Sequence, residues 1–394
     1  MANVSSSNGL EKRPKLRFPG FEEPWKDTFF SDLYEAVSEK NDGSFGVENI
    51  ISVANMYFKE DARITDEEYL KTYNIFKVGD IAFEGNKSND FSHGRFVENT
   101  IGDGIVSHVF VVFRPLHDTH NLRYWKYAIN NESVMGRILA RCTKKTTMMT
   151  NLVTKDFLNQ TILCPSAQEQ DKIANLLDGI SERIKLQKLY VESLKKYKRG
   201  LLSNLFGEKI TQGCTTKSYY FSEIAQRRSE KYDPSSGIEY PCVELENIEQ
   251  ETGKILATVP STAQSSIKNI AMPGDTLFGK LRPYLRKYAF AKKTMACSSE
   301  IWALIPSDVV LPKFLFYLVQ TEHFLRVANI SSGTKMPRAE WSNIEKAEFF
   351  IPDFSVQRKV VSLLEGLDQK ITFADSTLLS LNRLKASLLQ HLFI

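Results

Sequence analysis

Two stretches of the chain carry the same spacing of apolar residues. Steps of four and three residues in turn, taken from Ile173 to Leu205, meet eight apolar residues in ten positions, and the same steps from Val360 to Leu392 meet nine. An average step of about 3.5 residues is typical of a coiled-coil seam. We therefore predict two long helices that pair with each other, although each could instead pair with another protein. The predicted seam residues are Ile173, Leu177, Ile180, Ile184, Leu194, Leu201, Val360, Leu364, Leu367, Ile371, Leu381 and Leu388.

The two stretches are copies of one another. Residues 161–206 align with residues 348–393 at an offset of 187 without a gap, and fourteen of the 46 positions are identical, which is too many for an ungapped chance match. Both copies place a lysine at the same seam position, Lys198 and Lys385, and a polar seam residue can fix helix register. Ser166 with Glu169 fits a capping box at the first helix start, and Asp353 is the equivalent cap.

A globular block precedes each helix, and the two blocks are weakly related. "FKVGDIAFEGNKS" aligns with "AMPGDTLFGKLRP", and the shared Gly-Asp pair predicts a turn before a strand. Residues 122–138 and 312–328 then predict one amphipathic helix each, followed by polar loops. The fold class expected is α/β (α+β), with two similar globular domains, two long helices and a pseudo-twofold internal repeat.

Composition and cysteine usage exclude several classes of protein. With 42% apolar and 25% charged residues the chain is an ordinary globular protein, and its net charge of +4 is too small to indicate nucleic acid by itself. Five scattered cysteines indicate reduced thiols, and His117 with His120 is interpreted as a surface turn, so we expect no metal. The start has no apolar signal core and no apolar run could span a membrane, so we expect a cytoplasmic protein.

The segment "GDTLFGKL" lacks one residue of a phosphate-binding loop. Leu281 stands where a magnesium-binding hydroxyl belongs, and Pro283 opposes the helix that such a loop opens, so an ATP site is disfavoured. The following run "KLRPYLRKYAFAKK" interleaves basic and aromatic residues, which suits a nucleic-acid backbone with bases nearby. A solvated hairpin is the alternative interpretation of the same charges.

The chain resembles the specificity subunit of type I restriction-modification systems. The resemblance is carried by "KLRFPGFEEPWK", "GDTLFGKLRPYLRK", "SSEIWALIP", "SGTKMPRAEWSNI" and "IPDFSVQRKVVSLLEGLDQKI". It implies a non-catalytic chain whose two target-recognition domains each read half of a bipartite site in double-stranded DNA. The helices would pair antiparallel, hold the domains apart and dock two methyltransferase subunits, with two motor-nuclease subunits able to join.

The resemblance also implies where the cofactor and the domains lie. S-adenosylmethionine would bind to the methyltransferase subunits and no cofactor to this chain, which has no [DN]PP[FYW] run for a flipped adenine. The predicted parts are a disordered tail 1–17, target-recognition domain 18–160, long helix 161–207, linker 208–218, target-recognition domain 219–347 and long helix 348–394.

Basic and amide side chains in the polar loops are the candidate DNA contacts, since arginine and lysine suit guanine or phosphate and asparagine suits adenine. In the first block they are Lys87, Asn89, His93, Arg95, Lys144, Lys145 and Thr147. In the second they are Lys280, Arg282, Tyr284, Arg286, Thr334, Lys335 and Arg338. Two rival functions remain at this point, a coiled-coil scaffold whose globular blocks bind protein, and a phosphate-loop enzyme.

Overall fold

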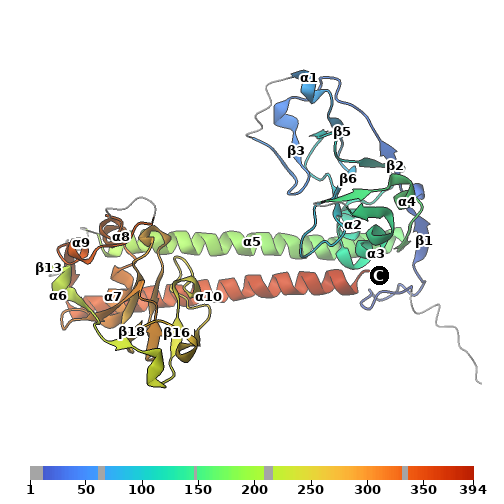
Figure 1. Ribbon diagram of the computed structural model, residues 1–394. Helices are drawn as coiled ribbons and strands as arrows, with labels where there is room; N and C mark the ends of the chain where they lie inside the picture. The colour runs from blue at the N-terminus through green and yellow to red at the C-terminus, as the bar shows by residue number, and fades with distance from the viewer. Residues whose placement is uncertain (1–11, 61–66, 146–148, 208–215, 331–335) are drawn as a thin grey trace, which may run out of the picture. The chain divides into compact units, whose positions relative to one another are not determined.

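The computed structural model describes residues 12–60, 67–145, 149–207, 216–330 and 336–394, and the chain divides into two compact units (Figure 1). Unit 1 contains residues 1–187 and 377–394, and unit 2 contains residues 188–376. Each unit therefore holds one globular block, one end of the first long helix and the opposite end of the second. The two units are described separately.

Unit 1 is built on a four-stranded antiparallel sheet in the order β2-β9-β6-β7. Its strands are β2 (Tyr34–Val37), β9 (Val112–Pro115), β6 (Ile81–Glu84) and β7 (Arg95–Glu98). The described part of unit 1 has four further two-stranded pairs: β1 (Lys26–Phe29) with β12 (Thr161–Cys164), β3 (Ile51–Ser52) with β4 (Tyr57–Phe58), β5 (Asn74–Phe76) with β8 (Gly104–Val106), and β10 (Thr143–Lys145) with β11 (Thr150–Leu152).

Among the described residues, four short α-helices belong to the globular block of unit 1: α1 (Glu67–Leu70), α2 (Leu122–Ala128), α3 (Glu132–Cys142) and α4 (Thr154–Leu158). Phe157 of α4 is fully buried, and its ring centroid lies 4.4 Å from that of Phe30, 4.5 Å from that of Phe96 and 5.0 Å from that of Phe113. Burying one such ring stabilises a fold by about 1.5–3 kcal/mol, so this aromatic group forms the centre of the block.

Unit 2 repeats the same plan. Its four-stranded antiparallel sheet runs β14-β22-β19-β20, with strands β14 (Ala225–Arg227), β22 (Ile301–Pro306), β19 (Thr276–Gly279) and β20 (Tyr288–Phe290). A two-stranded pair joins β13 (Thr216–Tyr220) to β23 (Glu348–Pro352), as β1 joins β12. The short helices are α6 (Phe221–Ile224), α7 (Pro312–Leu318), α8 (Glu322–Ala328) and α9 (Trp341–Ile344).

The blocks differ in the part that lies beyond the shared sheet. Unit 2 has a five-stranded sheet there, in the order β15-β18-β21-β16-β17, in which only the β16–β21 pair is parallel among the described strands. Its strands are β15 (Lys231–Tyr232), β18 (Lys268–Ala271), β21 (Met295–Cys297), β16 (Pro241–Val243) and β17 (Val259–Pro260). Unit 1 has the small pairs β3–β4 and β5–β8 in its place.

The Gly-Asp pair makes the same turn in both units. Gly79 and Gly274 have φ of +91° and +97°, a left-handed conformation that favours glycine. The following carboxylates, Asp80 and Asp275, are buried and receive bidentate hydrogen bonds from Arg114 and Arg228 at 2.6–2.9 Å. The pKa of each arginine is raised, first of all by the hydrogen bonds that it donates to its aspartate partner. The motif thus fixes the start of β6 and β19.

The two long helices are α5 (Ala167–Leu205) and α10 (Phe354–His391). In unit 1 the start of α5 shares a core with the end of α10, through Ile173 and Leu177 on α5 and Leu388 on α10. In unit 2 the end of α5 shares a core with the start of α10, through Leu202 and Leu364. The pairing within each unit is therefore antiparallel, as in an antiparallel coiled coil (Figure 1).

None of the twelve predicted seam residues is exposed. Seven are buried and five half-buried, the latter being Ile180, Ile184, Leu194, Leu201 and Leu381. The seam lysines are held by other groups. Lys198 forms an ion pair with Asp368 at 2.7 Å, and its ammonium lies 5.5 Å from the ring centroid of Tyr317. Lys385 lies 5.6 Å from the ring centroid of Tyr127.

Identical residues of the repeat make identical contacts at the helix starts. The Gln170 and Gln357 amides donate to the carbonyls of Pro165 (3.2 Å) and Pro352 (2.9 Å). The predicted capping box is half wrong. The Ser166 hydroxyl accepts from the Glu169 N–H, but the Glu169 carboxylate is turned away from the helix start, and it accepts from Arg17 instead.

The prediction of one amphipathic helix in each block is wrong. Each becomes two short helices, α2 with α3 and α7 with α8, broken at matching places. Asn131 and Thr321 cap the second helix of each pair with their side-chain oxygens, and such caps favour a new helix start over continuation. Among the described residues no helix combines the length and the apolar content that a bilayer crossing needs.

Candidate nucleic-acid interface

Two loops that the sequence offered separately meet in unit 2. A backbone bridge joins Leu281 to Arg338, the Arg282 N–H donates to the Pro337 carbonyl (2.7 Å), and the Ala339 N–H donates to the Lys280 carbonyl (2.8 Å). Lys280 and Arg282 follow the end of β19. Leu281 is half-exposed, because it lies in this loop pair.

Arg282 has a backbone conformation that side chains rarely adopt. Its φ of 52° and ψ of 61° are left-handed, and the residue begins a tight turn over Pro283–Leu285 in which the Leu285 N–H donates to the Arg282 carbonyl (2.9 Å). Such conformations cost about 1–3 kcal/mol and cluster at functional sites. The Arg282 side chain is exposed, and among the described residues no carboxylate pairs with it.

The other cations of this loop pair are tied to acids. Glu300 holds both Arg338 (3.1 Å) and Lys280 (4.0 Å). Arg286, also left-handed at φ 52°, is paired with Glu251 and with Glu322 (3.5 and 2.7 Å). These side chains are positioned by the protein, whereas Arg282 is available to a ligand. Tyr284 between them is 53% exposed.

A basic groove of about 630 Å³ adjoins the loop pair, and the sequence argument missed it. Arg227 lies in it with its guanidinium 4.8 Å from the Trp341 ring centroid and 5.8 Å from the Trp302 ring centroid. Lys231 and Lys280 also line the groove. The signal in the sequence was "QRRSEK", a short basic run that begins within β14 and continues past its end. A guanidinium braced by aromatic faces is a preorganised phosphate or base contact.

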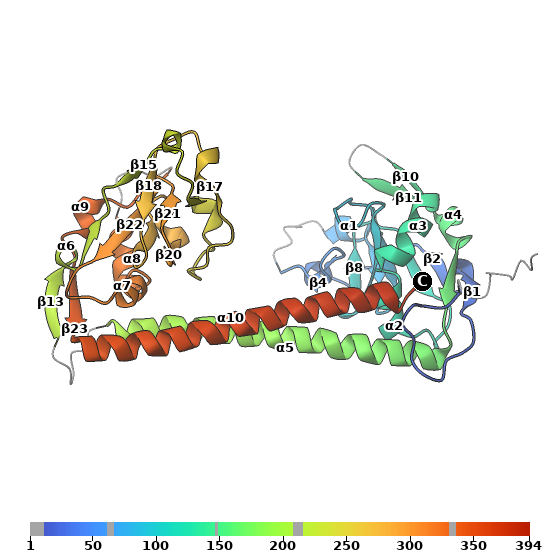
Figure 2. The same cartoon turned by 90° about the horizontal axis from the view of Figure 1, so that it is seen from below.

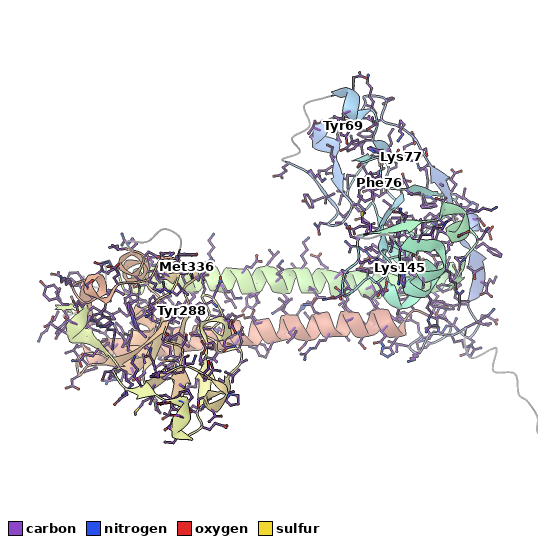
Figure 3. The ribbon with its side chains drawn as sticks, viewed as in Figure 1. Tyr69, Phe76, Lys77, Lys145, Tyr288 and Met336 are labelled. Carbon is purple, nitrogen blue, oxygen red and sulfur yellow. The ribbon has the colours of Figure 1, made fainter. Side chains whose placement is uncertain are left out.

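Unit 1 pairs the corresponding loops. Asn86, in the loop after β6, bridges Met149, and the Thr150 N–H donates to the Gly85 carbonyl (2.9 Å). This brings the loop with Lys87 and Asn89 against the β10–β11 hairpin, in which Lys144 and Lys145 are exposed. Lys145 is labelled in Figure 3. Within unit 1 the hairpin lies away from the long helices (Figure 2).

Two predicted contacts of unit 1 are engaged in the fold. The Arg95 guanidinium pairs with Glu84 (2.7 Å), donates to the Ala54 carbonyl (2.6 Å) and lies over the Phe91 ring. His93 is half-buried, and its carbonyl accepts from the Thr150 hydroxyl (2.9 Å). Three more predicted contacts, Thr147, Thr334 and Lys335, lie outside the described residues.

The histidine pair does not form a surface turn as a whole. His117 is exposed, but His120 is half-buried, stacks on Trp125 at 5.2 Å and shares a hydrogen bond with the Tyr34 hydroxyl (2.9 Å). Burial lowers the pKa of His120 to about 4, so the ring is neutral near pH 7. Across the described ranges no three histidine, cysteine, aspartate or glutamate side chains gather as metal ligands do.

Comparisons with known proteins support the resemblance. Residues 221–383 match the family described as the type I restriction modification DNA specificity domain. The chain is 26% identical over 198 residues to the type I restriction enzyme HindI specificity subunit of Haemophilus influenzae, covering 45% of this chain and 40% of that one. It is 22% identical over 252 residues to the EcoDI specificity subunit of Escherichia coli, covering 54% and 56%.

The fold has a counterpart among solved structures. The crystal structure of the type I restriction-modification system S subunit from M. genitalium superposes with a TM-score of 0.56 at 18% identity, over 97% of this chain and 99% of that one. The sequence matches to the two curated relatives span about half of those proteins. The similarity to specificity subunits that the sequence motifs indicated is confirmed.

Proposed function

We propose that this chain, a member of the type I restriction-modification specificity subunits, reads a bipartite sequence in double-stranded DNA. Each unit reads one half-site with the loop pair that follows an inner strand of its sheet, β6 or β19. The chain supplies recognition and carries out no chemistry itself. It acts in the cytoplasm, where its DNA substrate lies.

The observation that carries this proposal is the recurrence of one loop pair in both units, with different side chains on it. Unit 1 presents Lys87, Asn89 and the lysines of the β10–β11 hairpin, whereas unit 2 presents Arg282 beside Lys280. Two loop pairs with the same backbone arrangement and different side chains suit two different half-sites. Arginine binds guanine in a bidentate manner, asparagine binds adenine in the same way, and lysines mainly hold phosphates.

The partners follow from the same proposal. The paired helices dock two methyltransferase subunits, which bring S-adenosylmethionine, and two motor-nuclease subunits can join them. Because the match to the type I restriction modification DNA specificity domain covers residues 221–383, most of which belong to unit 2, the assignment rests most firmly on that unit. This chain needs no cofactor of its own for recognition.

Exchange of one globular block tests the proposal. Residues 221–347 would be replaced by the equivalent block of a homologue with a different target, leaving the β13–β23 pair in place to carry the graft. We expect methylome sequencing of cells with the reconstituted system to show one changed half-site and one unchanged half-site. A change in both halves, or in neither, would contradict separate reading by the two units.

The scaffold alternative predicts a different behaviour towards DNA. If the blocks bind only protein, the complete methyltransferase complex should show no duplex binding that depends on this chain. DNA reading instead predicts that the logarithm of the affinity falls linearly with the logarithm of salt concentration, by nearly one unit per phosphate contact. A salt titration with a labelled duplex separates the two.

A further inference from the structure

A second basic cavity lies within unit 2. It has a volume of about 310 Å³, at the small end of the range for ligand pockets. One side is formed by the last turns of α5 and by α10, the other by α7, by the turn at residues 250–254 and by the flank of β20. Among the described candidate DNA contacts, only Arg286 lines the cavity.

Positive charge exceeds negative charge around this cavity. Seven cationic side chains line it, namely Lys195, Lys198, Arg199, Lys254, Arg286, Lys292 and Lys313. Five carboxylates pair with them, namely Glu251, Glu322, Glu365, Asp368 and Asp375. Seven positive and five negative charges leave a surplus of two. Among the described residues no carboxylate pairs with Lys292, which is exposed at the margin of the cavity.

The wall of the cavity also holds a buried acceptor without a donor. Gln320 is 4% exposed, lines the cavity, and its Oε1 has no hydrogen-bond partner. Its Nε2 donates to the Phe316 carbonyl (2.9 Å), so the amide cannot be reversed without opposing two oxygens. An unsatisfied buried acceptor costs about 1–3 kcal/mol, which a ligand N–H would recover.

Aromatic side chains complete the lining. Tyr288, marked in Figure 3, and Phe316 are buried, and Phe290 is half-buried. The Lys313 ammonium lies 4.3 Å from the Phe290 ring centroid and 5.5 Å from that of Phe316, which places cationic charge directly beside the apolar wall. A ligand suited to this wall is flat and apolar at one end and anionic at the other.

We propose that this cavity binds a mononucleotide. The phosphate, a dianion near neutral pH, balances the surplus of two charges and meets Lys292. The base lies against the aromatic wall, and an exocyclic amine donates to Gln320 Oε1. A free phosphate lacks the base, and a nucleoside lacks the charge, so neither satisfies both ends of the cavity. The proposal does not depend on DNA reading, because Arg286, the candidate DNA contact that lines the cavity, is already paired with Glu251 and Glu322.

Calorimetric titration of the full chain, without DNA, tests the site. The probes are adenosine 5′-monophosphate, adenosine, inorganic phosphate and purine riboside 5′-monophosphate, which lacks the exocyclic amine. We expect saturable binding of adenosine monophosphate, at least tenfold weaker binding of adenosine and phosphate, and severalfold weaker binding of the purine riboside nucleotide. Absence of saturable binding up to millimolar concentration, or equal binding of phosphate and adenosine monophosphate, would overturn the proposal.

Two variants test which residue contacts the phosphate of the ligand and which contacts its base. Lys292→Gln should weaken adenosine monophosphate severalfold and leave adenosine unchanged. Gln320→Leu should remove the preference for adenosine monophosphate over the purine riboside nucleotide. The matched control is Lys293→Gln, because Lys293 is an exposed neighbour that does not line the cavity. Equal effects of Lys292→Gln and Lys293→Gln, or a preference that survives Gln320→Leu, would contradict the assignment. Because Lys292 is exposed, its variant is expected to fold even if Gln320→Leu does not.

Discussion

Arg282 combines three properties that rarely occur together in one residue. Its backbone is strained, its guanidinium is exposed, and none of the described carboxylates neutralises it. The strain is held by the bond from its N–H to Pro337 on the neighbouring loop. A protein that needed only a positive surface would not require this arrangement, because an unstrained lysine would supply the same charge. The geometry is better explained by a need to orient the planar guanidinium group of Arg282.

Replacing Arg282 by alanine and by lysine distinguishes the effect of an oriented guanidinium group from the effect of the positive charge alone. We expect Arg282→Ala to lower discrimination at one position of the second half-site by about 1–3 kcal/mol, and Arg282→Lys to restore general affinity but not that discrimination. The measurement is binding of the reconstituted methyltransferase complex to matched and singly mismatched duplexes at two salt concentrations. A uniform loss with a salt slope reduced by about one, rescued by lysine, would make Arg282 a phosphate contact. Unchanged binding would remove it from the interface.

Glu98, at the end of β7, gives unit 1 a dependence on pH. The side chain is 4% exposed, neither carboxyl oxygen has a hydrogen-bond partner, and burial raises its pKa from 4.5 to about 9. The folded state therefore keeps the proton over a range where the unfolded chain has lost it. Stability is highest below the unfolded pKa and falls as pH rises towards 9, by up to about 1.4 kcal/mol per unit.

The amide variant Glu98→Gln should remove this slope. We expect its melting temperature to exceed that of the wild type increasingly between pH 6 and pH 9, because a neutral side chain carries no ionisation cost. Thermal unfolding at several pH values measures the difference. The control is Glu35→Gln, an exposed glutamate on β2 of the same sheet, which should follow the wild type. A wild-type slope retained in Glu98→Gln would show that another group is responsible.

At the scale of elements, the segment "KLRFPGFEEPWK" acts as a clasp. Arg17 binds Glu169, 1% exposed, with two hydrogen bonds (2.8 and 2.9 Å), and the Trp25 indole N–H donates to the same carboxylate (3.2 Å). The Leu16 N–H donates to the His391 carbonyl at the end of α10 (2.9 Å). The segment thus joins the start of α5 to the end of α10 within unit 1.

Breaking the clasp should destabilise unit 1. Arg17→Ala leaves the Glu169 carboxylate buried with one remaining donor, and removing one partner of a buried ion pair typically costs about 3–5 kcal/mol. Thermal unfolding and limited proteolysis should show the loss, whereas Arg13→Ala, at an exposed neighbouring position, should change little. The double variant Arg17→Met with Glu169→Leu should recover part of the stability, since it removes the uncompensated charge. A double variant that is less stable than Arg17→Ala would contradict this explanation.

Features set by local periodicity could be predicted from the sequence, and features set by distant partners could not. The heptad spacing gave the long helices and their buried faces, and the Gly-Asp pair gave the turn before a strand. The carboxylate of Glu169 was assigned to its own helix start, because a local rule cannot foresee Arg17. Each pair of short helices was predicted as one helix, because in the sequence Asn131 and Thr321 cannot be distinguished from other polar residues. Only the structure shows that their side chains accept N-cap hydrogen bonds. The loop pairs could not be found at all, since they join residues more than 50 positions apart.

At the scale of the whole molecule, the repeat gives both helices equivalent points for lengthening. Lys188 and Asp375 correspond under the offset of 187 residues. A seven-residue insertion after each one preserves the 3.5-residue seam, while a four-residue insertion would rotate the apolar face away from its partner helix. Seven residues add about 10 Å of helix, the length of about three base pairs at roughly 3.4 Å each.

If the paired helices set the distance between the half-sites, the double insertion should lengthen the spacer of the methylated sequence by about three base pairs and leave both half-sites intact. Methylome sequencing of cells carrying the lengthened chain reads both quantities at once. Insertion after Lys188 alone is the control, because it displaces the seam of one helix against the other and should abolish modification. Retained methylation at the original spacing in the double insertion would show that the helices dock partners without measuring DNA. Changed half-sites with an unchanged spacer would show that recognition depends on the helices themselves, and the separation of reading from spacing would then be wrong.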